Sequence, residues 1–235
     1  MREAGEPGDA GGERWGGRSA GPAQPRARLR MLGRQNMDQP FIGRLPIISV
    51  LFGVVLLAVA TVWYPGGYRW GDHTISALFQ RVTSSGVSNP AWPLAMIGVL
   101  AVMSGIALLF YCVSQQTCRR FHKTTIQIAG IAATVFATLT VALLHDLMAA
   151  LALVSFLVAV VAVLHVLYDD RAIGLLALGV LSLAIELGTG VLYFGRIWLQ
   201  FLPVAQKAAL GLVGFWLLLV QHRSRLPRAS QPAPS

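Results

Sequence analysis

A few ionisable and nucleophilic side chains interrupt long apolar runs, and they are where chemistry is expected. Glu186 is a carboxylate about two turns from the end of one such run, and the pair His145 and Asp146 breaks another. Polar groups inside a membrane face the interior of a helix bundle and often mark functional sites. A general acid or a proton relay needs a neutral carboxyl group, which removal from water favours. Ser76, His145 and Glu186 are the candidate catalytic residues.

A loop before the second apolar run supplies further donors. If it folds back over the bundle, Asp72, His73 and Ser76 meet His145 and Asp146 in one aqueous vestibule. Two histidines and two or three carboxylates would suit a divalent metal, and Ser76 would suit a hydrolytic nucleophile. The candidate metal ligands are His73, His145 and Asp146; the sequence identifies no cofactor, and zinc belongs only to the alternative in which the chain is a metal-dependent hydrolase. The candidate ligand-binding residues are Asp72, His73, Asp146, Gln206 and Lys207.

The spacing of these residues is not that of a known metal or hydrolase motif. Neither H-E-x-x-H nor G-x-S-x-G occurs in the apolar runs or in the loops between them. A polar turn that caps two helices accounts for His145 and Asp146 equally well.

Two polar stripes follow helical spacing inside the apolar runs. One comprises Gln127, Thr134, Thr138 and His145, and the other comprises Ser182, Glu186, Thr189 and Tyr193. Lys207, about one turn from the end of the last run, is the expected counter-ion of Glu186. That ion pair would serve a ligand or only fix helix register, and small polar residues at such spacings also serve ordinary helix packing.

The elements that would position these residues are membrane-spanning helices. Hydrophobic residues make up 55% of the chain and charged residues 12%, against about 25% charged in a soluble domain. The run from Thr124 to Leu167 is too long for one span of a core about 30 Å thick, so it must turn at His145 and Asp146. The sequence predicts an all-α, six-transmembrane-helix bundle with spans 47–64, 94–113, 124–143, 147–167, 172–193 and 203–220.

The distribution of Lys and Arg near the span ends predicts the orientation. One side carries Arg34, Arg44, Arg119, Arg120, Lys123, Arg171, Arg223, Arg225 and Arg228, and the other carries Arg69, Arg81 and Arg196. This bias places both termini in the cytoplasm and the vestibule on the outer face. Basic residues in tails and short loops do not predict nucleic-acid binding. Residues 1–40 and 223–235 are expected to be disordered tails around a membrane domain, 41–222. Cleavage of the first apolar segment as a signal peptide, after Ala58-Val59-Ala60, is the alternative.

Several motifs carry a resemblance that covers 47–220. YPGGY and HTISALF follow the first span, Asn89 lies in the long loop, LLHDLMAALALVSF joins the third and fourth spans, and LPVAQKAALGLVGFW forms the last. Together they resemble bacterial and archaeal six-helix membrane proteins of unknown function, related to the Frag/DRAM/Sfk group. The family pattern sets Ile75-Ser76 after the first span, His145 at the centre and Gln206-Lys207 early in the last span. Ala77-Leu78 departs from it, because relatives have a glycine nearby.

The resemblance implies a six-helix bundle with links to lipid organisation and no agreed activity. A more distant likeness of layout relates the chain to intramembrane metal-dependent lipid hydrolases, which need three zinc histidines that the predicted outer side does not offer. Our first hypothesis is therefore an outer-facing polar vestibule that binds a lipid head group or another small ligand. The alternative is a metal-dependent lipid hydrolase or acyl-transfer enzyme, and a proton-coupled transporter built on Glu186 ranks third because no internal repeat is evident.

Overall fold

The computed structural model describes residues 43–83, 85–141 and 144–223. Within these ranges the chain is helical and contains no strand, only an isolated bridge between Val82 and Ser88. The helices are α2 (Leu45–Val62), α3 (Trp92–Ser114), α4 (Arg120–Leu139), α5 (His145–Asp169), α6 (Ile173–Phe194) and α7 (Leu202–Arg223), with the short 3₁₀ helices η1 (Ile75–Phe79) and η2 (Leu199–Phe201). The all-α prediction is confirmed, and the expected tails lie almost wholly outside the described residues.

Five of these helices, α2, α3, α5, α6 and α7, are long and apolar enough to cross a membrane. Large apolar side chains also cover their surfaces. On α2 alone, Leu51, Phe52 and Val55 each expose more than half of their surface. Soluble monomers rarely expose apolar patches of this extent, so the chain is a multi-pass membrane protein.

Helix α4 is the one predicted span that is not counted among the five. Its first turn holds Arg120, His122 and Lys123, which lower its mean hydropathy. It nevertheless packs against α3 and α5, and Gly130 lets it approach α3 closely. A Cβ at Gly130 would lie 2.4 Å from the Phe110 ring.

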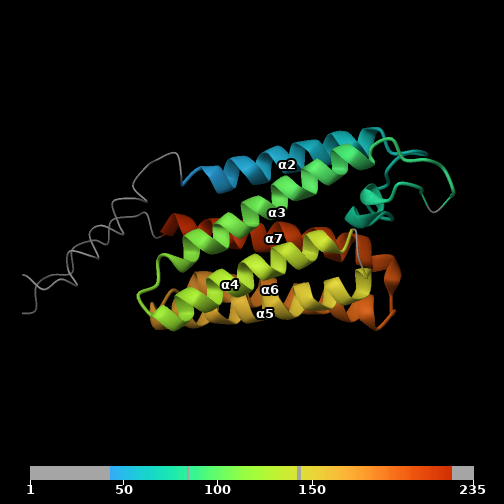
Figure 1. Cartoon of the computed structure of the whole chain (residues 1–235). Coiled ribbons are helices and arrows are strands. Elements are labelled where there is room, and N and C mark those ends of the chain that lie inside the picture. The colour runs from blue at the N-terminus through green and yellow to red at the C-terminus, as the bar shows by residue number, and fades with distance from the viewer. Residues whose placement is uncertain (1–42, 84, 142–143, 224–235) are drawn as a thin grey trace, which may run out of the picture. The chain divides into compact units, whose positions relative to one another are not determined.

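The helices alternate in direction, so their connections gather at two ends (Figure 1). We call one the long-loop end, which carries residues 63–91, the α4–α5 turn and the α6–α7 connection. We call the other the basic end, where α3 joins α4, α5 joins α6 and α7 finishes. Proline stands in the first turn of α2 and α3, where its missing N–H breaks no helical bond.

The core lies where α3, α4, α5 and α7 meet. Phe110 and Trp216 are fully buried there, and the Trp216 indole N–H donates a hydrogen bond of 2.9 Å to the Leu175 carbonyl oxygen of α6. A second, smaller core lies under the long loop and includes Tyr64 and Leu78. The long loop is therefore packed and forms part of the folded domain.

Two details of the predicted elements are corrected. Helix α4 ends at Leu139, four residues before the predicted end of the span. His145 is the first residue of α5, so it does not continue the polar stripe of Gln127, Thr134 and Thr138. Between α5 and α6 the chain turns tightly, with Arg171 at a φ of 54° and its N–H bonded to the Tyr168 carbonyl oxygen.

Candidate functional site

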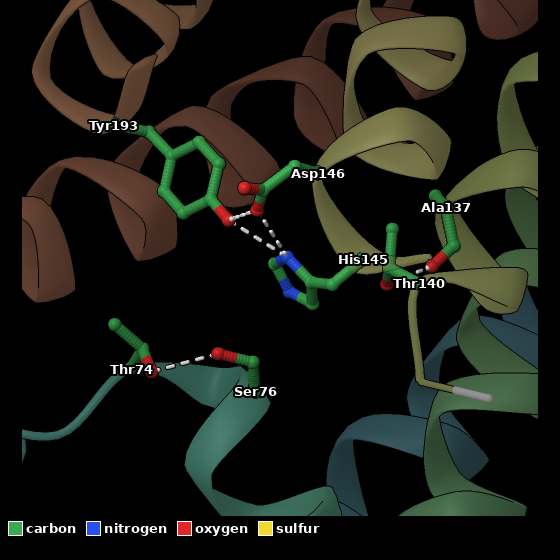
Figure 2. Close-up of polar contacts among 7 residues, drawn as sticks. All are labelled: Thr74, Ser76, Ala137, Thr140, His145, Asp146 and Tyr193. Carbon is green, nitrogen blue, oxygen red and sulfur yellow. Dashed lines mark hydrogen bonds and ion pairs between the residues drawn. The ribbon is translucent and has the colours of Figure 1, made fainter. Parts of the chain in front are cut away.

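Three polar side chains meet at the long-loop end, between the start of α5 and the last turn of α6 (Figure 2). The Tyr193 hydroxyl contacts His145 Nδ1 at 2.7 Å and donates a short hydrogen bond to Asp146 Oδ1. His145 Nδ1 lies 3.4 Å from the same Asp146 oxygen. Asp146 occupies the first turn of α5, where a negative charge interacts favourably with the helix dipole. These three side chains link the start of α5 to the last turn of α6 at the long-loop end.

A pocket of about 460 Å³ opens beside this cluster. Its lining residues are Asp146, Tyr193, Phe194, Arg196, Leu199 and Leu202. They come from α5, from the end of α6 and from the connection that leads through η2 into α7. The volume falls within the range of about 300–1,000 Å³ that is typical of ligand sites. A carboxylate, a phenol and a guanidinium thus share one pocket wall with apolar side chains.

The α6–α7 connection has an unusual backbone. Arg196 and Trp198 have φ values of 51° and 47°, a left-handed conformation that costs about 1–3 kcal/mol for a residue with a Cβ. Surrounding contacts hold it: the Arg196 N–H bonds to the Tyr193 carbonyl oxygen, and the Phe201 N–H bonds to that of Trp198. The backbone of the connection is therefore held in a defined conformation at these two residues.

A second, almost wholly apolar pocket of about 400 Å³ uses the same segments. Its lining residues are Ile185, Gly188, Thr189, Val191, Leu192, Ile197, Trp198 and Ala205. The Thr189 hydroxyl on its wall donates to the Ile185 carbonyl oxygen of the same helix at 2.9 Å. We call this pocket the apolar groove and the first one the polar pocket.

Lys207 has a different partner from the one expected. Its ammonium group donates to the carbonyl oxygens of Trp70 at 2.8 Å, His73 at 2.6 Å and Pro203 at 3.1 Å, and it lies 5.4 Å from the centre of the Tyr68 ring. The predicted ion pair with Glu186 is wrong, because all three donors of Lys207 bind carbonyl groups. Glu186 makes no hydrogen bond or ion pair within the described residues.

Gln206 and Lys207 together anchor the long loop to α7. The Gln206 Oε1 atom accepts a hydrogen bond of 3.1 Å from the Ile75 N–H at the start of η1. Deeper in the loop, the fully buried Asn89 side chain donates to the Leu78 and Gln80 carbonyl oxygens and accepts from the Ala91 N–H. Gln206 and Lys207, predicted as ligand-binding residues, thus have structural partners.

His73 is held among aromatic rings away from the Tyr193 cluster. Its Nδ1 accepts a hydrogen bond of 3.0 Å from the Arg69 N–H, and its ring packs at 5.2 Å from that of Tyr64. The Tyr68 hydroxyl donates to the His73 carbonyl oxygen at 2.9 Å. Burial, helped by the neighbouring Tyr64, raises the pKa of Tyr68 from its ordinary value to about 12. Asp72 pairs with Arg69 at 3.0 Å on the loop surface.

Neither the predicted metal set nor the predicted catalytic set is assembled. Within the described residues no three His, Cys, Asp or Glu side chains form a metal-binding group, so His73 does not join His145 and Asp146. The Ser76 hydroxyl bonds to that of Thr74 at 2.8 Å and points toward it, away from His145 (Figure 2). Ser76, His145 and Glu186 share no hydrogen bond.

Comparison with known proteins adds no identity. No protein-family model, curated protein or solved structure matches the chain. The resemblance described above therefore stays a prediction, and the site must be interpreted from its own geometry.

The sequence did not indicate a functional role for three residues of the site. Tyr193 belongs to a predicted polar stripe, Arg196 is one of the basic residues that predict the orientation, and Trp198 carries no signal of its own. The signal that could have found them is their place: an Arg and a Trp in a short loop between two apolar runs, within five residues of a Tyr at the end of the first run. Aromatic and basic residues gather at membrane interfaces for several reasons, so this signal is weak alone.

Proposed function

We propose that this chain is a six-span membrane protein with both termini in the cytoplasm, whose polar pocket binds a lipid head group or a similar small ligand at the outer membrane surface. The observation that carries the proposal is the lining of that pocket. Asp146 and Arg196 line it together without forming an ion pair with each other. The Asp146 contacts with Tyr193 and His145 use Oδ1 alone, so the second carboxylate oxygen and the Arg196 guanidinium are suited to a charged ligand.

Several features support α4 as the sixth span. It has 20 residues, and at about 1.5 Å of rise per residue this length matches a hydrocarbon core of about 30 Å. Its neighbours α3 and α5 are both candidate spans. The basic residues of its first turn would lie at the cytoplasmic interface, where their long side chains reach water.

The excess of basic residues at the basic end supports the orientation. Arg119, Arg120, Lys123, Arg171 and Arg223 lie there, whereas Arg69, Arg81 and Arg196 lie at the long-loop end. Short loops rich in Lys and Arg stay in the cytoplasm, so the pocket would open to the outer surface of the cell membrane.

Binding is tested by native mass spectrometry of detergent-purified protein given a total membrane lipid extract. We expect about one tightly held ligand per wild-type chain. Arg196→Gln removes a charge-assisted contact worth about 1.5–3 kcal/mol, which should weaken retention about ten- to a hundredfold. Arg120→Gln, a charge loss on the exposed surface of the basic end, is the matched control and should retain the ligand. Equal retention by the two variants would refute the proposal.

A further inference from the structure

We propose that the ligand is an intact phospholipid with a primary amine in its head group, held by the polar pocket and by one acyl chain in the apolar groove. This inference rests on the proposed function and specifies the ligand of the same site. It follows from two observations: the polar pocket offers a guanidinium and a carboxylate oxygen that have no other hydrogen bond among the described residues, and neighbouring residues of the α6–α7 connection line the polar pocket and the apolar groove.

The polar pocket offers a separate partner for each charge of a zwitterion. The Arg196 guanidinium makes no hydrogen bond or ion pair within the described residues, and its planar array of donors matches phosphate geometry. On Asp146, both contacts use Oδ1: the Tyr193 hydroxyl and His145 Nδ1 meet that atom. Oδ2 is therefore available to accept hydrogen bonds, and a primary ammonium group supplies them.

This arrangement also ranks the head groups. A quaternary choline nitrogen has no N–H to donate to Asp146, and a glycerol head group has no positive charge. The structure therefore favours ethanolamine over choline and glycerol. A lone phosphate would satisfy Arg196 but leave the carboxylate facing an anion.

The apolar groove flanks the polar pocket along one short segment. Arg196 and Leu199 line the polar pocket, while Ile197 and Trp198 between them line the groove. The groove walls also come from α6 and the start of α7, both candidate membrane spans. An occupant of both pockets must therefore have a charged part and an apolar part. A phospholipid entering from the surrounding bilayer has both, whereas a soluble head group has only the first.

Gly188 allows the chain-binding step to be tested separately. It lines the groove, and a Cβ at this position would meet no atom within 4 Å. A leucine at this position therefore has room for its Cβ, and we expect its side chain to occupy the groove. Gly211 on α7 is equally open to a side chain but does not line either pocket, so Gly211→Leu is the matched control.

The experiment titrates delipidated protein by native mass spectrometry with ethanolamine, choline and glycerol phospholipids of identical acyl chains, and with soluble glycerophosphoethanolamine. We expect the ethanolamine lipid to bind about tenfold or more tightly than the other two lipids, in line with one charge-assisted hydrogen-bonded contact. Asp146→Asn should remove that preference. Gly188→Leu should weaken lipid binding about tenfold and leave the soluble head group unaffected, while Gly211→Leu should change neither.

The outcomes separate this inference from the proposed function. Equal binding of the three lipids would overturn the amine assignment. If the soluble head group binds as tightly as the lipid and Gly188→Leu has no effect, the acyl-chain assignment is overturned. The polar pocket would still be a ligand site. If Arg196→Gln weakens the binding of no ligand, the proposed function is refuted as well. Unchanged thermal unfolding of each variant verifies that it is folded.

Discussion

At the scale of single residues, side chains that bond to backbone groups hold the long loop in place. Asn89 satisfies two carbonyl oxygens and one N–H inside the loop, and the Lys207 ammonium group satisfies two further loop carbonyl oxygens from α7. A buried backbone group without a partner costs about 1–3 kcal/mol. These two side chains therefore replace the hydrogen bonds that a strand or helix would have supplied.

Asn89→Ala should loosen the loop without unfolding the bundle. It leaves the Leu78 and Gln80 carbonyl oxygens without donors, so we expect a loss of about 2–4 kcal/mol in local stability. Hydrogen exchange measured by mass spectrometry on peptides covering 75–91 should accelerate, while peptides from α5 should not change. Asn89→Asp keeps the shape but removes the donors, so it should behave like Asn89→Ala. Unaltered exchange in both variants would show that this side chain does not hold the loop.

Tyr68 predicts how the loop responds to alkali. Its pKa is raised from the ordinary 10.0 to about 12, so folding favours the neutral phenol. The contribution of the neutral Tyr68 phenol to folding stability is complete below about pH 10 and is lost as the pH rises through about 12. The difference in tyrosinate absorbance between wild type and Tyr68→Phe should therefore show one midpoint near pH 12. A midpoint near pH 10 would indicate an exposed Tyr68 and a different loop.

At the scale of elements, glycines set how closely the helices approach. A Cβ on Gly53 would lie 2.5 Å from the Gly98 carbonyl oxygen, and one on Gly179 would lie 2.6 Å from both Leu164 and Trp216. Between membrane helices, association depends on such close packing, because lipid is as apolar as the side chains it replaces. The contacts α2–α3 and α5–α6–α7 depend on these small residues.

Gly179→Leu should disrupt the packing of α6 on α5 and α7. Its side chain would collide with the buried Trp216 ring, and overpacking costs about 1–3 kcal/mol or more. Gly174→Leu, on the same helix with no atom within 4 Å of its Cβ, should change stability by about 0.5 kcal/mol or less. Thermal unfolding in detergent compares the two variants. Equal stability of the pair would contradict the packing described for α6.

The helices could be predicted from the sequence because membrane spans are encoded locally, by apolar runs of about 20 residues. All six predicted runs contain a helix, with ends that differ by four residues or fewer. The two loop partners of Lys207, Trp70 and His73, could not be predicted in this way. They lie in a loop more than 130 residues earlier, and its path depends on Asn89 and on an aromatic cluster, which periodicity does not encode.

The sequence predicts only part of the candidate site, because only that part is encoded locally. His145 and Asp146 were recognised because they interrupt an apolar run. Their link to Tyr193 requires the side-by-side placement of α5 and α6. The role proposed for Arg196 depends on a left-handed backbone at a non-glycine residue, which sequence patterns do not favour. Local signals therefore identified single polar residues, and tertiary packing decided which of them met.

At the scale of the whole molecule, the alternation of helices predicts opposite exposure of the two ends. Cys118 is exposed at the basic end, and Cys112 is buried. In intact cells a membrane-impermeant maleimide should not label wild type until the membrane is permeabilised. Val87→Cys, at a half-exposed position of the long loop, should be labelled from outside in a chain that carries Cys118→Ala. Labelling of Cys118 in intact cells would reverse the proposed orientation.

The most direct test of the lipid site is crosslinking inside the native membrane. Trp198 lines the apolar groove and exposes 69% of its surface, and Trp63, at the end of α2, exposes 60% and lines neither pocket. Benzoylphenylalanine replaces each residue in turn, the cells are irradiated, and intact-protein mass spectrometry identifies the attached lipids. The account predicts that adducts at position 198 are enriched in ethanolamine phospholipid over the bulk membrane, whereas adducts at position 63 match the bulk. The same lipid distribution at both positions would contradict it.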